Sequence, residues 1–264
     1  MAKSFQTEFV DYYKDKLAAK GFVKVKGRQP YFVRVVNDEI LHVITYLNRP
    51  STEIKFKKAF ELACGVATVY KKEIDFSVSP TKNDDWLVCQ TSIEKKIETW
   101  HTDIRMKGIL RTIYYNDDII PETLQKTEEG MDVLLEVLDK VINMEEVAKY
   151  FMKYDVKNFR FKHLTDDGWY DQECLYYCRK EYDFSIMSDI AKFMIEDFKN
   201  PHICVFYDEF EIEKWEQNII NKRNMFINNE IDYEIGMELL KKHYEHNLET
   251  LHNYGIEISR HAFL

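Results

Sequence analysis

The sequence predicts an α+β fold, with an antiparallel sheet flanked by helices and followed by a mainly helical C-terminal part. Alternating apolar and polar residues, which are typical of strands, dominate residues 30–115. Apolar residues three and four positions apart, which are typical of helices, dominate residues 121–154 and 208–254. No helical pattern lies between Tyr31 and Tyr70, so we do not expect a doubly wound parallel sheet, which needs helices between its strands.

The chain is expected to open with an amphipathic helix, because large apolar residues recur at helical spacing at Phe5, Phe9, Tyr12, Tyr13 and Leu17. Gly21 is expected to end this helix as a C-cap glycine. Two β-rich runs follow, over residues 31–35 and 40–47. Asn37-Asp38 lies between them and favours a tight turn, so the two runs predict a hairpin.

Three further strands are expected before residue 116. The first alternates from Ile54 to Tyr70, and Gly65 within it suggests a bulge or a bend. The others are residues 86–90 and residues 108–115. Helices are then expected from apolar stripes in residues 131–142, 147–152, 187–198, 212–219 and 233–251. We assign residues 1–155 to an α+β sheet domain and residues 156–264 to a mainly helical, acidic region.

Composition indicates a protein that folds on its own core. The chain has 264 residues, of which 45% are apolar and 14% aromatic, enough to bury a sizeable core. Its apolar runs are too short to cross a bilayer, and no secretory signal is recognisable, so we expect a soluble, cytoplasmic protein. Five cysteines without framework spacing favour reduced thiols, and no disulfide is expected.

Charge is distributed unevenly along the chain. Residues 1–120 carry 20 Lys and Arg against 16 Asp and Glu, a net +4, and residues 121–264 carry the remaining 17 against 30, a net −13. The acidic half would repel nucleic-acid backbone, so such a contact would have to use the N-terminal half. No nucleic-acid partner is favoured.

The N-terminal half resembles a bacterial domain-of-unknown-function family. The residues that carry the resemblance are the leading amphipathic helix, the Gly21-Phe22 step followed by lysines, and the strand Tyr31, Phe32, Val33, Arg34. An antiparallel meander and a closing helix complete the likeness, which covers about half of the chain. The resemblance implies an α+β sheet domain and supplies no catalytic residues.

Two groups of side chains contain residue types that bind metal ions. Cys174 and Cys178 would lie one helical turn apart, but no second cysteine pair completes a site. His243, His246 and Glu249 follow each other at three-residue spacing in the last predicted helix, and a solvated polar face explains them better than a metal site does. We therefore predict no metal and no cofactor.

A pattern of carboxylates with a lysine suggests a metal-dependent nuclease, in which acidic residues hold Mg²⁺ and a lysine stabilises charge. Asp38 with Glu53-x-Lys55 is one match, and Asp85 with Glu94-x-Lys96 is the other. Glu-x-Lys arises readily by chance in a chain that is 31% charged, so neither match is assigned as a site. No GxGxxG, GxxxxGK[ST] or GxSxG motif occurs, and no catalytic residue is predicted.

The candidate binding residues lie in an aromatic and acidic stretch of the C-terminal half: Asp166, Asp167, Trp169, Tyr170, Asp171 and Glu173. Tyr and Trp beside carboxylates are typical of surfaces that bind proteins or cationic ligands. The preferred function is therefore a non-enzymatic bacterial binding protein, an accessory or immunity-type factor whose acidic half meets a basic protein partner. The alternative is a metal-dependent phosphodiesterase or nuclease.

Because neither group of metal ligands is complete, the purified protein is expected to contain no stoichiometric zinc, and a chelator should leave its thermal midpoint unchanged. Elemental analysis and thermal melts with and without EDTA check this. One zinc ion per chain would contradict it.

Overall fold

A computed structural model of the chain describes residues 3–52, 54–71, 73–82, 87–89, 112–143, 146–147, 150 and 233–259, with the backbone alone for residues 87–89 and 233–240. The chain divides into two compact units. One comprises residues 1–69, 73–142 and 247–264, and the other residues 70–72 and 143–246. The sheet and its covering helices belong to the first unit.

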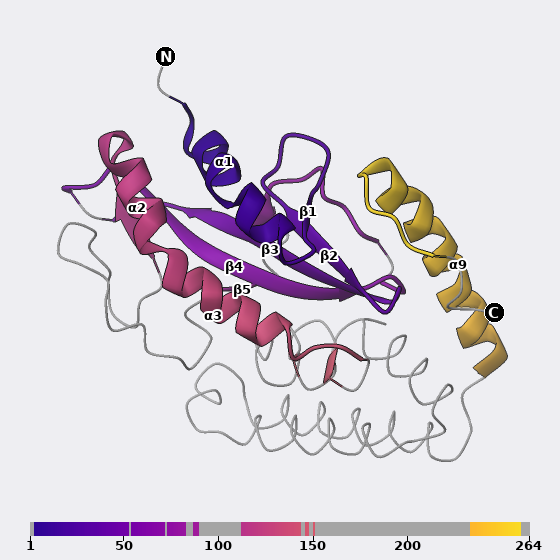
Figure 1. Cartoon of the computed structure of the whole chain (residues 1–264). Helices are drawn as coiled ribbons and strands as arrows, with labels where there is room; N and C mark the ends of the chain where they lie inside the picture. The colour runs from indigo at the N-terminus through magenta and orange to yellow at the C-terminus, as the bar shows by residue number, and fades with distance from the viewer. Residues whose placement is uncertain are drawn as a thin grey trace, which may run out of the picture. The chain divides into compact units, whose positions relative to one another are not determined.

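Among the described residues, six antiparallel strands form the sheet. They are β1 (Val23–Lys24), β2 (Phe32–Val36), β3 (Ile40–Arg49), β4 (Lys58–Thr68), β5 (Leu87–Cys89) and β6 (Ile113–Tyr115). Figure 1 shows β1 to β5. Strands β1 to β5 follow one another in sequence order, and β6 pairs with the first residues of β4. Every pairing between the described strands is antiparallel, which together with the helices confirms the predicted α+β fold class.

The described helices follow the predicted change of pattern. They are α1 (Phe5–Ala18), η1 (Pro80–Lys82), η3 (Asp117–Ile119), α2 (Ile120–Lys126), α3 (Glu128–Leu138) and α9 (Tyr233–Asn253). The predicted helices within residues 187–219 lie outside the described residues. Gly21, three residues after α1, has a φ of 83° and lets the chain turn out of the helix, while the backbone N–H of Phe22 donates to the Leu17 carbonyl at 3.0 Å.

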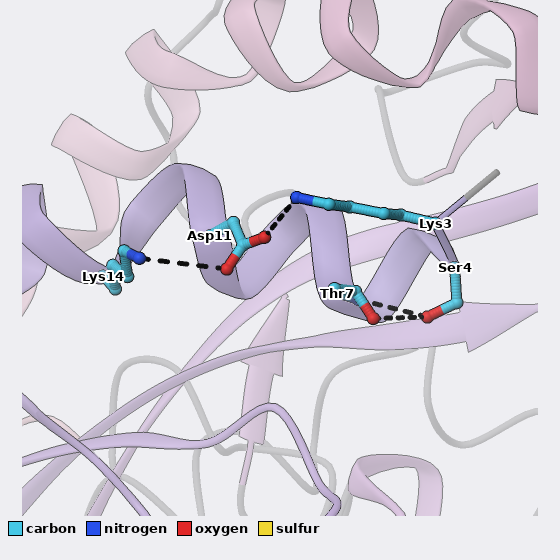
Figure 2. A network of polar contacts seen from close by, with 5 residues as sticks. All are labelled: Lys3, Ser4, Thr7, Asp11 and Lys14. Atoms are coloured by element: carbon cyan, nitrogen blue, oxygen red, sulfur yellow. Dashed lines mark hydrogen bonds and ion pairs between the residues drawn. The ribbon is translucent and has the colours of Figure 1, made fainter. Parts of the chain in front are cut away.

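The first turn of α1 is fixed by polar side chains (Figure 2). Ser4 is the N-cap, and its hydroxyl accepts a hydrogen bond from the backbone N–H of Thr7 at 3.2 Å. Lys3 lies 2.8 Å from the carboxylate of Asp11, and Lys14 contacts the same carboxylate at 3.9 Å. The cap satisfies one free N–H of the helix, whereas the exposed ion pairs contribute little.

One face of the sheet is covered by α1, α2 and α3 (Figure 1). Directly paired residues of antiparallel strands share a face, which places Phe32, Ile44, Tyr46 and Phe60 together. The ring of Phe9 lies 4.8 Å from that of Tyr46, and the ring of Phe5 lies 4.6 Å from that of Phe60. The core between α1 and the sheet is therefore largely aromatic.

The opposite face carries Tyr31 and Val43, and both are fully buried. The ring of Tyr31 lies 5.1 Å from that of Phe76, and its hydroxyl donates to the Val78 carbonyl at 3.4 Å. Phe76 in turn lies 5.6 Å from the ring of Tyr254, just beyond α9. Residues 74–78 thus cover part of this face.

The β2–β3 turn has the geometry that its sequence predicts. Asn37 and Asp38 have φ values of 52° and 58°, and the N–H of Glu39 donates to the Val36 carbonyl at 3.2 Å. Two central residues with positive φ define a type I′ turn, whose twist suits a two-residue hairpin.

Three details differ from the sequence-based expectation. Strand β4 runs without a bulge through Gly65, which pairs with Val43 on one side and Leu87 on the other. It begins at Lys58, and Ile54 is a fully exposed turn residue before it. Tyr12 and Ile142, both expected on apolar helix faces, are 36% and 52% exposed. A pattern of apolar residues cannot tell the centre of a buried face from its margin.

No helix in the described part of the chain combines the length and the apolar character that a membrane span requires.

Replacing Phe9 with alanine should lower the free energy of unfolding by about 3–5 kcal/mol, because the ring is fully buried among other aromatic rings. Urea denaturation monitored by circular dichroism measures the change. Ile142→Ala is the control, since that side chain is half exposed and its truncation should cost less than about 0.5 kcal/mol. Equal losses in the two variants would contradict the described core.

Candidate functional site

Arg34 on β2 is the centre of a polar cluster at the edge of the covered sheet face. Its Nη2 lies 2.6 Å from Oδ1 of Asp139 and 2.9 Å from Nδ1 of His42. Its Nη1 donates to the Lys20 carbonyl at 3.2 Å, and the guanidinium lies 4.7 Å from the centre of the Phe22 ring. One side chain therefore links the residues after α1, strands β2 and β3, and the end of α3.

His42 is fully buried, and both of its ring nitrogens have hydrogen-bond partners. Nε2 lies 2.8 Å from the carbonyl of Val141, which can only accept, so Nε2 carries the proton. Nδ1 then accepts from Arg34. Burial lowers the pKa of His42 to about 4, the hydrogen bond to Val141 opposes the shift, and the neighbouring Arg34 adds to it.

This cluster is a structural one. A general base needs a free nitrogen and a pKa near the working pH, and His42 has neither. The contribution of the cluster is to hold α3 on the sheet: Asp139 is the C-cap of that helix, and Val141 follows it by two residues. The hydrogen bond from Asn37 Nδ2 to the Ile142 carbonyl, at 2.7 Å, adds a further tie there.

A second ion pair, which is partly buried, lies on the opposite face of the sheet. Nε of Arg49 is 2.8 Å from Oε2 of Glu61, whose other oxygen accepts from Thr112 at 2.9 Å. The Glu61 side chain is only 9% exposed. Both carboxylate oxygens are occupied, so this pair also joins strands rather than presenting a reactive group.

The structure does not bring together Asp38 and Lys55, the two described residues of the nuclease-like pattern. Asp38 lies in the turn before β3, and Lys55 lies in the loop after it. A ten-residue strand is about 30 Å long, so these two side chains cannot serve one metal ion. Asp38 instead accepts from the backbone N–H of Ser259 at 3.2 Å. Glu53 and the second match lie outside the described residues.

The histidines of the last helix are also apart from any described cluster. His243 lies 3.2 Å from the carbonyl of Tyr70, whereas His246 and Glu249 are exposed. In the part of the chain that the structure describes, no three His, Cys, Asp or Glu side chains are grouped so that they could hold a metal ion.

The predicted binding residues lie in a part of the chain that the structure does not describe. Asp166, Asp167, Trp169, Tyr170, Asp171 and Glu173 all lie outside the described residues, as do Cys174 and Cys178. The docking surface expected from them stays a prediction. Cys64, on β4, is buried.

A basic surface that the sequence-based predictions do not include lies at β1 and its flanking loops. Residues 20–34, here called the basic hairpin, contain five cationic residues and no acidic one: Lys20, Lys24, Lys26, Arg28 and Arg34. Lys20, Lys26 and Arg28 are exposed, and Val23 between them is 48% exposed. The missed signal was local: nine residues, 20–28, hold four of these charges.

The basic hairpin is held in a defined conformation by segments that are distant in sequence. The N–H of Lys26 donates to the Tyr254 carbonyl at 2.9 Å, and Gln29 donates to the Ser77 carbonyl at 3.4 Å. Gly255 lies so close that a Cβ there would be 2.9 Å from Cε of Lys26. The ammonium of Lys24 folds back onto the Val25 carbonyl at 2.6 Å. The exposed cations therefore project from an ordered loop.

No protein-family model, curated protein or solved structure matches this chain. The resemblance of the N-terminal half to a bacterial family accordingly stays a prediction.

The stability of the protein should fall as the pH drops from about 6.5 to about 4, because the unfolded chain takes up a proton at His42 that the folded chain refuses. Because the pKa of His42 is lower in the folded than in the unfolded protein, its contribution to the free energy of unfolding is complete above about pH 6.5. This contribution is lost as the pH falls to about 4. Full loss would correspond to about 3 kcal/mol. Urea denaturation across this pH range measures it.

His42→Gln is the matched variant, since glutamine can hydrogen-bond but does not titrate. Its free energy of unfolding should be lower at neutral pH and should change less between pH 6.5 and 4 than that of the wild type. Parallel curves for the two proteins would show that His42 contributes nothing to the pH dependence.

Proposed function

We propose that this chain is a non-enzymatic binding protein that recognises charged partners through separate acidic and basic surfaces. One observation carries the proposal: the charged groups around Arg34 and Glu61 bond to other groups of the protein, whereas Lys20, Lys26 and Arg28 of the basic hairpin are exposed on an ordered loop. Charged groups that bond within the protein stabilise the fold, whereas exposed charges on an ordered loop can recognise a charged partner.

For the acidic half we propose a basic protein partner. Residues 121–264 carry a net charge of −13, and their aromatic and acidic stretch at 166–173 has the composition of a protein-binding surface. An accessory or immunity-type factor in a bacterial cytoplasm is the kind of protein that this proposal describes.

A basic partner should dissociate as the salt concentration rises, because exposed charge pairs are screened over about 8 Å at physiological ionic strength. Replacing Asp166, Asp167, Asp171 and Glu173 with their amides should slow association by roughly tenfold or more and leave folding nearly intact. The partner recovered with the tagged chain would be purified, and association rates measured by surface plasmon resonance at several salt concentrations.

The matched control removes the same charge elsewhere. Asp118, Glu122, Glu245 and Glu249 are exposed, and their amide variants should leave the association rate much less affected. Partner binding that is indifferent both to salt and to the 166–173 substitutions would refute the acidic docking surface.

A further inference from the structure

We propose that the outer edge of β1, in the basic hairpin, binds an extended acidic peptide segment of a partner protein, which adds to the sheet as a further strand. The inference rests on the proposed binding function and names the partner chemistry of its basic surface. β-Strand addition derives affinity from main-chain hydrogen bonds and specificity from alternate side chains. The edge, the charge and the apolar side chain of this site each support it.

The edge strand directs main-chain groups away from the sheet. The N–H of Val25 donates to the Tyr31 carbonyl at 3.0 Å, so Val25 and Val23 direct their peptide groups toward β2. Lys24, which lies between them, therefore directs its N–H and C=O away from the sheet. No described residue forms a hydrogen bond with the backbone N–H or C=O of Lys24.

Two residues further along, the same edge already forms a main-chain hydrogen bond with another segment of the protein. Lys26 directs its N–H outward, and the Tyr254 carbonyl accepts that hydrogen bond at 2.9 Å. The chain around Tyr254 thus occupies the position that an added strand would take at Lys26. At Lys24 the corresponding position has no occupant among the described residues, and an incoming peptide would continue there.

The charge of the site selects an acidic occupant. Between Asp15 and Asp38 the sequence has no acidic residue, and Lys20, Lys26 and Arg28 are exposed on either side of β1. Carboxylates of a peptide lying along β1 would meet these cations from both ends. The whole chain carries a net charge of −9, so an acidic peptide is attracted to local basic surfaces of this kind and not to the protein as a whole.

An exposed apolar side chain gives the site a second means of selection. Val23 is 48% exposed and belongs to the strand itself. Side chains of a strand alternate between the two faces, so every second residue of an added peptide would lie on the same face as Val23. The favoured peptide therefore alternates acidic and β-branched residues.

The same observations disfavour nucleic acid. Binding of single strands uses exposed aromatic rings on which bases stack. The aromatic residues of the basic hairpin are Phe22, Tyr31 and Phe32, and none is more than 2% exposed. Cations without a stacking platform suit a peptide better.

The test uses the whole chain and a fluorescein-labelled peptide that alternates glutamate and valine, with binding followed by fluorescence anisotropy. Lys24→Pro removes the outward N–H, which no β1–β2 hydrogen bond uses, and Lys24→Gln removes the same charge but keeps the N–H. Lys24→Pro is expected to bind on the order of tenfold more weakly than Lys24→Gln, because a main-chain hydrogen bond of the complex is lost. Equal affinities would overturn strand addition.

A second measurement keeps the proposal falsifiable if the proline variant fails to fold. In the wild-type protein, the amide of Lys24 should exchange with solvent at least severalfold more slowly once the peptide is bound. The N–H of Val25 already has a partner and serves as the internal reference. Unchanged exchange at Lys24 with saturating peptide would overturn the proposal.

The charge requirement is tested by Lys26→Gln with Arg28→Gln. This double variant should weaken peptide binding and reduce its dependence on salt, whereas Lys55→Gln with Lys57→Gln removes the same charge from another exposed loop and should leave binding unchanged. Equal effects of the two double variants would show attraction to net charge alone. Oligothymidylate that competes as well as the peptide would show a general polyanion surface and likewise overturn the inference.

The two proposals fail separately. If the acidic peptide does not bind while the basic partner still associates with the acidic half, only the strand-addition inference falls. If the 166–173 variants leave partner binding unchanged while the peptide binds at β1, the acidic docking surface falls and the basic hairpin stands.

Discussion

The pairing of β3 with β4 is the interaction on which the rest of the first unit depends. Ten residue pairs join the two strands, and residues 40–47 and 59–68 are buried along their whole length. Strand β2 attaches to one side of this pair, and β5 and β6 share the other. Because both faces are covered, the two strands consist mainly of apolar residues, a pattern more usual in parallel sheets.

Two buried ionisable residues of this framework have defined partners. Glu61 on β4 has Arg49 and Thr112, and His42 on β3 has Arg34 and Val141. A buried ionisable group without partners would destabilise the fold, and replacing one member of such a set strands the other. The clusters fix which helix end meets which strand, and this makes the packing specific.

Local sequence pattern predicted the helices and turns that are determined by residues close together in the sequence. The aromatic spacing of α1 predicted Phe5, Phe9, Tyr13 and Leu17, all buried, and Asn37-Asp38 predicted its turn. The change of pattern after β6 predicted the helices α2 and α3.

Local sequence pattern did not predict the contacts between segments that are distant in sequence. Arg34 meets Asp139 and His42 meets Val141 across about a hundred residues, and a single sequence gives no sign of which pairs will meet. Asn247 interrupts the apolar seam of α9, yet it is fully buried and donates to the Val69 carbonyl at 2.9 Å. The basic hairpin was visible as composition. That β1 is an edge strand depends on the order of strands in the sheet.

The contact of Lys26 with Tyr254 and Gly255 bears on how the protein acquires its structure during synthesis. Residues 247–264 belong to the same compact unit as residues 1–69, and residues 143–246 are made in between. At translation rates of 5–20 residues per second, that interval lasts roughly 5 to 20 seconds. During this interval all six described strands have been made, but the face around Tyr31 and Phe76 lacks the ring of Tyr254. Apolar surface that stays uncovered during synthesis favours aggregation, so residues 247–264 protect a sheet whose described strands are made much earlier.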